Sequence, residues 1–346
     1  MNKSEVRLRT LVRLCLHRQL GTLRVRRLLA VGLAIVLLLS PCGSGNLLAG
    51  GYEQTIINRW CLQAMNVPQE PATGERVRIA LIDSGCSDAV GWLAAGQITP
   101  GQNYVFGTTN TLDSIGHGTQ VASILLGAND AGRELVGFSQ TGTIVPLVWI
   151  SKYASGVLAN GGVEALAAAI RDSVDIYRCR VVSISSGVTR DEPLLRDAIV
   201  HAEEQGAVVI AAVGNSNLYA PSAVYYPAAY ESVVGVGSVD SELRTSAWSQ
   251  RNQSVMLTAP GEGVYALTKA GLKQVSGTSF AAAHATAAVA RLLSCHPELT
   301  PADVRALLQR SAQDLGDAGY DTLYGHGLID LGRCLELAAE LAGGGR

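Results

Sequence analysis

Ser279 stands in a setting where a hydroxyl group could act as a nucleophile. It lies within the segment 275–293, two residues after Gly277. From Ser279 onward this segment is rich in alanine, and its apolar residues repeat at four-residue spacing. This spacing predicts a helix with Ser279 at its N-terminus, where unpaired N–H groups and the helix dipole favour developing negative charge. We expect Gly277 to give backbone freedom and room for a close approach. By itself the run is equally consistent with a serine that only caps a helix.

Two other residues have settings that would complete such chemistry. Asp83 follows the apolar stretch 77–82, and His117 opens a helical pattern in Gly-His-Gly-Thr. A serine that attacks a carbonyl requires a base to take its proton and an acid to orient that base, and an imidazole and a carboxylate can supply these roles.

The elements that must position these residues alternate along the chain. Short apolar runs typical of buried strands alternate with amphipathic helical runs, which predicts βαβ units and an α/β fold with a doubly wound, mostly parallel sheet. Ligands bind beyond the carboxyl ends of strands in such sheets, which is where Asp83, Ser186 and Asn215 fall. Pro146 casts doubt on full pairing of its strand. The expected strands are 77–82, 143–150, 181–186, 207–213 and 232–239, and the expected helices are 163–176, 191–205, 301–311, 331–341 and the one at Ser279.

The blocks that hold the polar residues resemble those of a known family. IALIDSG, GHGTQVAS, AAVGNSN and SGTSFAAAHA are similar, in order, to the four signature blocks of subtilisin-like serine peptidases. The resemblance extends from about residue 77 to residue 331 and implies a subtilisin-like three-layer sandwich. It also implies a triad in which Ser279 attacks, His117 is the general base and acid, and Asp83 orients the imidazole, with Asn215 as the oxyanion donor.

The same resemblance implies where a polypeptide substrate would bind. The substrate backbone would pair with an edge strand, Ser185-Ser186-Gly187, and one wall of the primary specificity pocket would be Ala212-Val213-Gly214. The small wall residues predict a pocket open to a sizeable side chain. The sequence departs from the common family pattern at Gln120, Ser123, Ser186 and Ala283, none of them a catalytic position.

The first 50 residues read as a basic leader with a hydrophobic signal or anchor segment, followed by one catalytic domain, 51–346. Residues 1–27 hold eight of the 27 Lys and Arg residues but one of the 29 acids, and 28–40 is an apolar block. We expect export to a periplasmic or extracellular location, with a cleaved signal and membrane association through 28–50 both left open. About 30 residues separate the leader from Asp83, which leaves no room for the usual folding pro-domain. Either this pro-domain is absent or another chain replaces it, and our hypothesis is that the fragment 51–346 refolds unaided.

Charge, cysteine content and spacing limit the partners and cofactors. Beyond residue 27 the chain has 19 basic and 28 acidic residues, a net charge of −9 with no basic stripe, which argues against nucleic acid. We expect a monomer that needs no cofactor for chemistry. The family resemblance implies structural calcium as a possibility at Ala128-Asn129-Asp130 with Glu134, in the loop after the His117 helix, where a solvated turn is at least an equal alternative. Of five cysteines beyond the leader, Cys295 and Cys334 are the best candidates for a disulfide.

Two alternatives to an endopeptidase remain open. One is a catalytically weak peptide-binding scaffold, and the other is an acyl transferase that uses the same site. An esterase of the α/β-hydrolase class fits poorly, because Ser279 is not in a Gly-x-Ser-x-Gly elbow and the acid precedes the histidine.

Overall fold

Strand β1 (Val77–Asp83) is apolar on both faces and lies within a parallel sheet. Its alternate side chains enter two separate cores, with Ile79 and Leu81 in one and Ala80 and Ile82 in the other. The computed structural model describes residues 58–70, 74–87, 97–130, 133–137 and 142–343. All of these belong to one compact unit, Leu48–Arg346.

The sheet has seven strands in the order β11-β10-β9-β8-β1-β5-β2, and its strand pairs are all parallel. Asp83, Ser185 and Asn215 follow or end the adjacent strands β1, β8 and β9, so they share one edge of the sheet. The remaining strands of the sheet are β2 (Gln102–Asn103), β5 (Gly142–Val148), β8 (Val181–Ile184), β9 (Val208–Ala212), β10 (Val234–Val239) and β11 (Leu257–Pro260).

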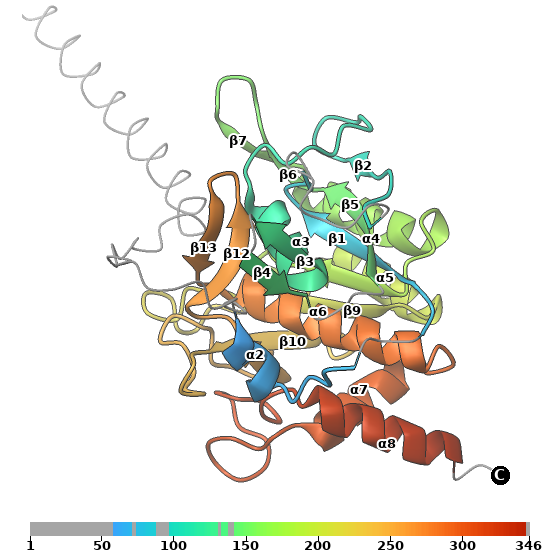
Figure 1. Ribbon diagram of the computed structural model, residues 1–346. Helices are drawn as coiled ribbons and strands as arrows, with labels where there is room; N and C mark the ends of the chain where they lie inside the picture. Colours follow the sequence, from blue (N-terminus) through green and yellow to red (C-terminus); the bar gives the residue numbers. More distant parts are fainter. Residues whose placement is uncertain (1–57, 71–73, 88–96, 131–132, 138–141, 344–346) are drawn as a thin grey trace, which may run out of the picture. The chain divides into compact units, whose positions relative to one another are not determined.

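Helices cover both faces of the sheet, which gives the three layers (Figure 1). On one face lie α3 (His117–Leu126) and α6 (Thr278–Cys295), with α2 (Arg59–Ala64), α7 (Pro301–Ser311) and α8 (Leu331–Gly343) packed against the same core. On the other face lie α4 (Gly162–Asp175) and α5 (Pro193–Glu204). Every residue of α6 from Thr278 to Ser294 is buried, because small side chains let it lie directly on the sheet.

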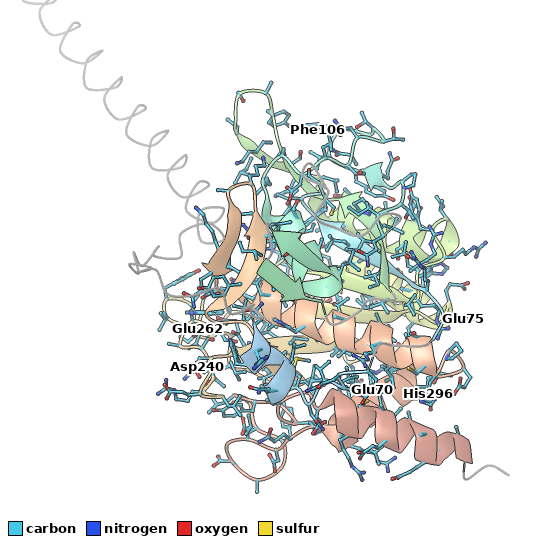
Figure 2. The ribbon with its side chains drawn as sticks, viewed as in Figure 1. Glu70, Glu75, Phe106, Asp240, Glu262 and His296 are labelled. Atoms are coloured by element: carbon cyan, nitrogen blue, oxygen red, sulfur yellow. The ribbon has the colours of Figure 1, made fainter. Side chains whose placement is uncertain are left out.

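Three two-stranded antiparallel ribbons flank this frame. They are β3 (Gly127–Asp130) with β4 (Arg133–Val136), β6 (Ile150–Lys152) with β7 (Leu158–Asn160), and β12 (Val264–Thr268) with β13 (Gly271–Val275). The β6–β7 ribbon contacts the segment before His117, because the Ser114 hydroxyl accepts from the Lys152 N–H at 3.2 Å. Near it, Phe106 packs on Tyr153 with ring centroids 5.5 Å apart (Figure 2).

Most of the predicted elements are present, with ends shifted by a few residues. Helix α7 begins and ends as predicted, because the Thr300 side chain accepts from the Asp303 N–H and Pro301 occupies the first turn. The doubt about Pro146 was wrong: β5 pairs with β1 along its whole length. Two residues earlier, Ile144 directs its N–H and C=O away from β1, to Gln97 and Thr99, so the nitrogen of Pro146 also faces away from that ladder.

The leader, residues 1–50, lies outside the described residues. Within the described ranges, no helix combines the length and apolar character that crossing a bilayer requires.

Candidate active site

The structure joins Asp83 and His117 across the sheet edge. His117 Nδ1 lies 2.8 Å from Oδ1 and 3.0 Å from Oδ2 of Asp83, and the Ser84 N–H donates to Oδ1 at 2.7 Å. The Asp83 side chain is 5% exposed and that of His117 is 18% exposed, so the carboxylate is sealed beneath an imidazole that still reaches solvent.

The electrostatics of this pair favour charge on both partners. Burial alone would raise the pKa of Asp83, but the charge and hydrogen bond of His117 and the Ser84 N–H outweigh it, and the pKa is lowered. Burial alone would lower the pKa of His117, but the charge and hydrogen bond of Asp83 and the charge of Asp113 raise it above 6.5. The imidazole is therefore a stronger base than a free histidine.

Asp113, which the sequence analysis did not single out, holds the start of α3. Its buried carboxylate accepts five hydrogen bonds: from the Ser84 hydroxyl, from the N–H groups of Ile115 and Gly116, and from both the N–H and the hydroxyl of Thr119. These bonds fix the turn from which His117 projects. An acid four residues before a histidine that opens a helix was the available signal.

Ser279 lies in the first turn of α6, one residue before a side chain that contacts the imidazole. The His117 ring centroid is 5.7 Å from that of Phe280, the next residue. Ser279 Oγ donates to the backbone carbonyl of Ser185 at 3.1 Å, and among the described residues it makes no hydrogen bond to His117. The hydroxyl is therefore turned toward the segment after β8.

Asn215 is held by the residue before Ser279. Its Oδ1 accepts from the N–H of Thr278 at 2.9 Å and from the Thr278 hydroxyl at 2.8 Å. With the oxygen occupied, the Nδ2 donor points toward the turn at Gly277, where a Cβ would lie 3.6 Å from it.

The expectation about Gly277 itself was wrong. Its φ of 163° is extended backbone that any residue adopts, and the atoms nearest to a Cβ there would be at ordinary contact distances. The close approach occurs at Gly261, whose carbonyl accepts from the Gly277 N–H at 2.8 Å and where a Cβ would lie 2.5 Å from Ser238 Oγ.

The residues predicted to bind substrate lie on two neighbouring strand ends. Ser185, Ser186 and Gly187 follow β8, and Gly214 follows Ala212 and Val213 at the end of β9. The Val213 side chain is fully buried in the core beneath α4 and α5, so this residue offers only its backbone at the surface.

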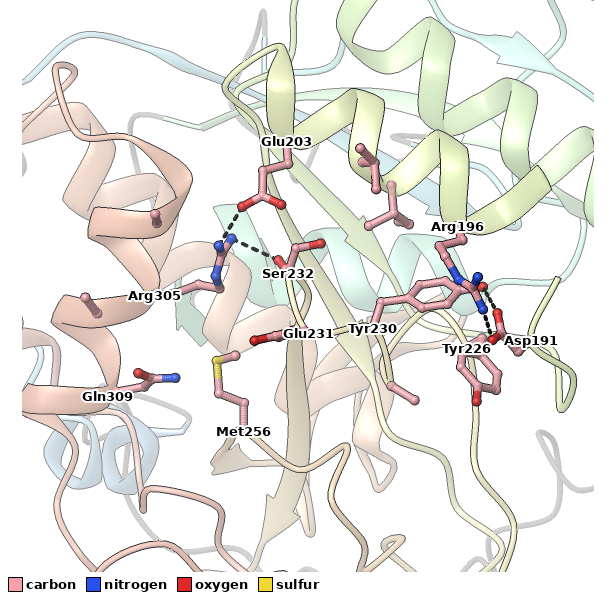
Figure 3. A pocket seen from close by; sticks show the side chains of 15 residues that line it. Asp191, Arg196, Glu203, Tyr226, Tyr230, Glu231, Ser232, Met256, Arg305 and Gln309 are labelled. Atoms are coloured by element: carbon pink, nitrogen blue, oxygen red, sulfur yellow. Dashed lines mark hydrogen bonds and ion pairs between the residues drawn. The ribbon is translucent and has the colours of Figure 1, made fainter. Parts of the chain in front are cut away.

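A cavity of about 730 Å³ lies elsewhere, between α5 and α7 (Figure 3). Four of its five charged groups form two ion pairs: Arg305 bonds Glu203 at 2.5 Å, and also the Ser232 carbonyl at 3.0 Å, while Arg196 pairs with Asp191. None of the predicted catalytic residues lines it. We therefore assign the cavity to the packing of the two helices rather than to the chemistry.

Known proteins resemble this chain in sequence and in fold. The family model described as the subtilase family matches residues 74–327. The chain belongs to the subtilase family of serine peptidases. The three-layer fold expected from the resemblance is also that of its structural neighbours. Fervidolysin from Fervidobacterium pennivorans, described as a keratinolytic enzyme related to subtilisin, superposes with a TM-score of 0.71 at 28% identity, over 80% of this chain and 45% of that one.

Curated subtilases cover similar parts of the chain. The minor extracellular protease Epr of Bacillus subtilis is 34% identical over 278 residues, which is 78% of this chain but 41% of that protein. Subtilisin DY of Bacillus licheniformis is 30% identical over 279 residues, 78% of this chain and 94% of that protein. The match to this subtilase thus spans less than half of the first relative and nearly all of the second.

One departure of this subtilase from the common family pattern has a structural reason. Ser123 is fully buried on α3, where its hydroxyl donates to the Gln120 carbonyl at 2.7 Å and accepts from the Leu267 N–H at 2.9 Å. The serine therefore ties α3 to β12.

The predicted disulfide between Cys295 and Cys334 was wrong. Neither of these two cysteines forms a disulfide with any residue that the structure describes. Cys334 is buried in the core from α8, whereas Cys295 is exposed at the end of α6, so the two side chains face different surroundings. Burial raises the pKa of Cys334 to about 11.

The predicted calcium residues fall on the β3–β4 ribbon, where Asn129 is directly opposite Glu134. The side chains of Asn129, Asp130 and Glu134 lie outside what the structure describes. Among the described residues, no group of three or more His, Cys, Asp or Glu side chains is placed to hold a metal ion.

Proposed function

We propose that this subtilase is an endopeptidase that cleaves polypeptides through an acyl-enzyme, with Asp83, His117 and Ser279 as its triad. The observation that carries the proposal is the buried Asp83 carboxylate bonded to Nδ1 of His117. This bond fixes the imidazole so that Nε2 can take the proton of a nucleophile. Ser279 immediately precedes Phe280, whose ring contacts the imidazole, and the family membership supports the choice of this serine as the nucleophile.

In the proposed reaction, Ser279 Oγ attacks the substrate carbonyl carbon while His117 takes the hydroxyl proton. The imidazolium, stabilised by Asp83, then returns that proton to the leaving amine, and water releases the acyl group by the same route. The Ser279 hydroxyl must first leave the Ser185 carbonyl. A substrate that pairs with the segment 185–187 would bring a backbone N–H to that carbonyl and free the hydroxyl to turn to His117.

We infer that Asn215 Nδ2 and the Ser279 N–H stabilise the oxyanion. The amide is oriented in advance, because both bonds from Thr278 occupy its oxygen and leave the nitrogen to donate. Ser279 also lies in the first turn of α6, where the helix dipole favours negative charge. Asn215→Ala should lower kcat about 10²- to 10³-fold, the loss known for such a donor in a subtilisin.

Active-site labelling tests the proposal. A fluorophosphonate should label the full chain at Ser279 and should not label Ser279→Ala, because the reagent reacts only with an activated serine. Ser294→Ala, which changes a buried serine near the other end of α6, is the matched control and should be labelled like the wild type. Equal labelling of wild type and Ser279→Ala, or none of the wild type, would refute the triad.

The same reagents separate the alternatives. A catalytically weak scaffold would bind peptides without being labelled. An acyl transferase would be labelled, but it would join the acyl fragment of a test peptide to an added amine rather than release it as a free acid. Mass spectrometry of the products with and without the amine distinguishes acyl transfer from hydrolysis.

We also propose that residues 1–50 direct export. The basic stretch before the apolar block 28–40 supports this, as does the extracellular relative. A fusion of residues 1–50 to alkaline phosphatase should be active in the periplasm. The N-terminus of the mature protein would then show whether the segment is cleaved or stays in the membrane, and an inactive fusion would contradict export.

A further inference from the structure

The ring of Tyr225 lies against Gly214, in the wall proposed for the primary specificity pocket. A Cβ built on Gly214 would be 2.5 Å from Cδ2 and 2.7 Å from Cε2 of that ring. Gly214 has a φ of +107°, a conformation that side chains other than glycine rarely adopt, so the ring meets bare backbone. The next residue is Asn215, so the ring is close to the reacting carbonyl in the proposed complex.

The chain that carries Tyr225 also touches the proposed substrate strand. Tyr226 and Val188 exchange backbone hydrogen bonds of 2.8 and 2.9 Å, and a Cβ on Gly187 would lie 2.3 Å from the Tyr226 carbonyl oxygen. The backbone of Tyr226 therefore contacts the segment after β8, while the ring of Tyr225 contacts the segment after β9. A substrate side chain held between those two segments would meet the ring.

Hydrogen bonds hold the ring in this place. The Tyr225 hydroxyl lies 2.7 Å from Ser216 Oγ, which in turn donates to Gln250 Oε1 at 3.2 Å. Gln250 is fully buried, and its Nε2 also binds the Ala223 carbonyl at 2.5 Å. A large substrate side chain could enter only by breaking this network, so the ring is a fixed part of the site.

We propose that Tyr225 fills the inner end of the primary specificity pocket and restricts the residue before the scissile bond to Gly, Ala or Ser. The inference rests on the proposed function and adds a substrate class to it. It reverses the expectation of a pocket for a sizeable side chain, because that expectation considered only the small residues of one wall. The ring comes from a segment 11 residues further along the chain.

Two peptides that differ only in Ala or Phe before the cleaved bond test the proposal. The wild type should cleave the Ala peptide with the higher kcat/KM. Tyr225→Ala should raise the ratio of kcat/KM for Phe over Ala by about 10- to 200-fold or more, the range for filling or emptying part of an apolar pocket. Tyr225→Phe is the matched control: it loses the hydroxyl and keeps the ring, and it should retain the preference for Ala.

Each result of this experiment either supports or overturns the assignment of Tyr225 to the pocket. A wild type that prefers Phe, or a folded Tyr225→Ala whose ratio is unchanged, overturns the proposal. If wild type is labelled by fluorophosphonate in that case, the proposed function survives and only the pocket assignment fails. If wild type is not labelled, the proposed function fails and this inference fails with it. If Tyr225→Ala shows no cooperative unfolding transition, a peptide library cleaved by wild type decides, since enrichment of Gly, Ala and Ser supports the proposal and enrichment of larger residues refutes it.

Discussion

Gly118 offers a way to separate Asp83 from His117 without changing either. A Cβ on Gly118 would lie 2.0 Å from the carbonyl oxygen of Gly85, and real Cβ atoms do not come within 3.0 Å of such an atom. The backbone of Gly85 continues directly from Asp83, and the Gly118 N–H also binds the Ser84 hydroxyl at 2.9 Å. Gly118→Ala must therefore move the first turn of α3 away from the end of β1 by about 1 Å.

A shift of that size is enough to disrupt the proposed pair. The distances from His117 Nδ1 to the Asp83 oxygens are 2.8 and 3.0 Å, and about 1 Å more takes both beyond the usual limit of about 3.2 Å. A 1 Å misplacement can cost about 10²-fold in rate, which corresponds to about 2.7 kcal/mol in the activation free energy. Gly118→Ala should also lose about 1–3 kcal/mol of unfolding free energy through overpacking.

The assay is kcat/KM on a cleaved peptide, corrected for the active fraction by fluorophosphonate titration, beside urea unfolding. Gly116→Ala is the matched control. A Cβ there would meet nothing within 4 Å, but φ is +105°, so this variant should lose about 1–2 kcal/mol of stability and little activity. Turnover of Gly118→Ala within about threefold of wild type would refute the reasoning. The structure would then have accommodated the added Cβ without separating His117 from Asp83.

Three further predictions concern titration and thiol reactivity. Because His117 must be neutral to act as a base and its pKa is raised, kcat/KM should fall as the pH drops through a value above 6.5. Asp113→Asn should move that limb to lower pH and cost about 1–3 kcal/mol of stability through weakened hydrogen bonds, whereas the exposed change Glu242→Gln should leave the limb in place. Burial lowers the pKa of His284 to about 4, so the unfolded chain binds the proton more tightly; stability should be complete above pH 6.5 and fall toward pH 4, by about 2 kcal/mol at pH 5. His284→Gln should flatten urea-unfolding stability over that window, and an unchanged slope would count against the burial argument. In native protein, Cys295→Ser should remove one fast-reacting thiol in a disulfide-reagent titration and Cys334→Ser none, and the opposite order would contradict the free-thiol arrangement.

The parts of the fold that local chemistry determines could be predicted from the sequence. Strand β1 has an apolar side chain on nearly every position, and α7 has its cap, its proline and its acid in consecutive residues, so both were placed within a residue. The two- and three-residue strands β2, β6 and β7 were missed, because such short elements carry no periodicity of their own and depend on the neighbours they pair with.

The candidate site was chosen from residues that each have a recognisable local setting in the sequence. Asp83, His117, Asn215 and Ser279 each stand at the end of a strand or the start of a helix. Tyr225 has no such setting. Its proposed role depends on the contact of its ring with Gly214, which forms only when the chain folds. The wrong disulfide has a similar origin. Cys295 and Cys334 both stand near an end of a C-terminal helix, but that position does not determine whether their side chains face each other.

The depth at which α6 is buried has a consequence for a molecule that would cut polypeptides. A helix enclosed along its length cannot fray by itself, so its amides should exchange with solvent only when the whole domain opens. Partly open forms of the domain would then keep α6 folded, with Ser279 still in its first turn. The nucleophile should therefore be lost only together with the whole fold, so that activity disappears in the same transition as the global structure.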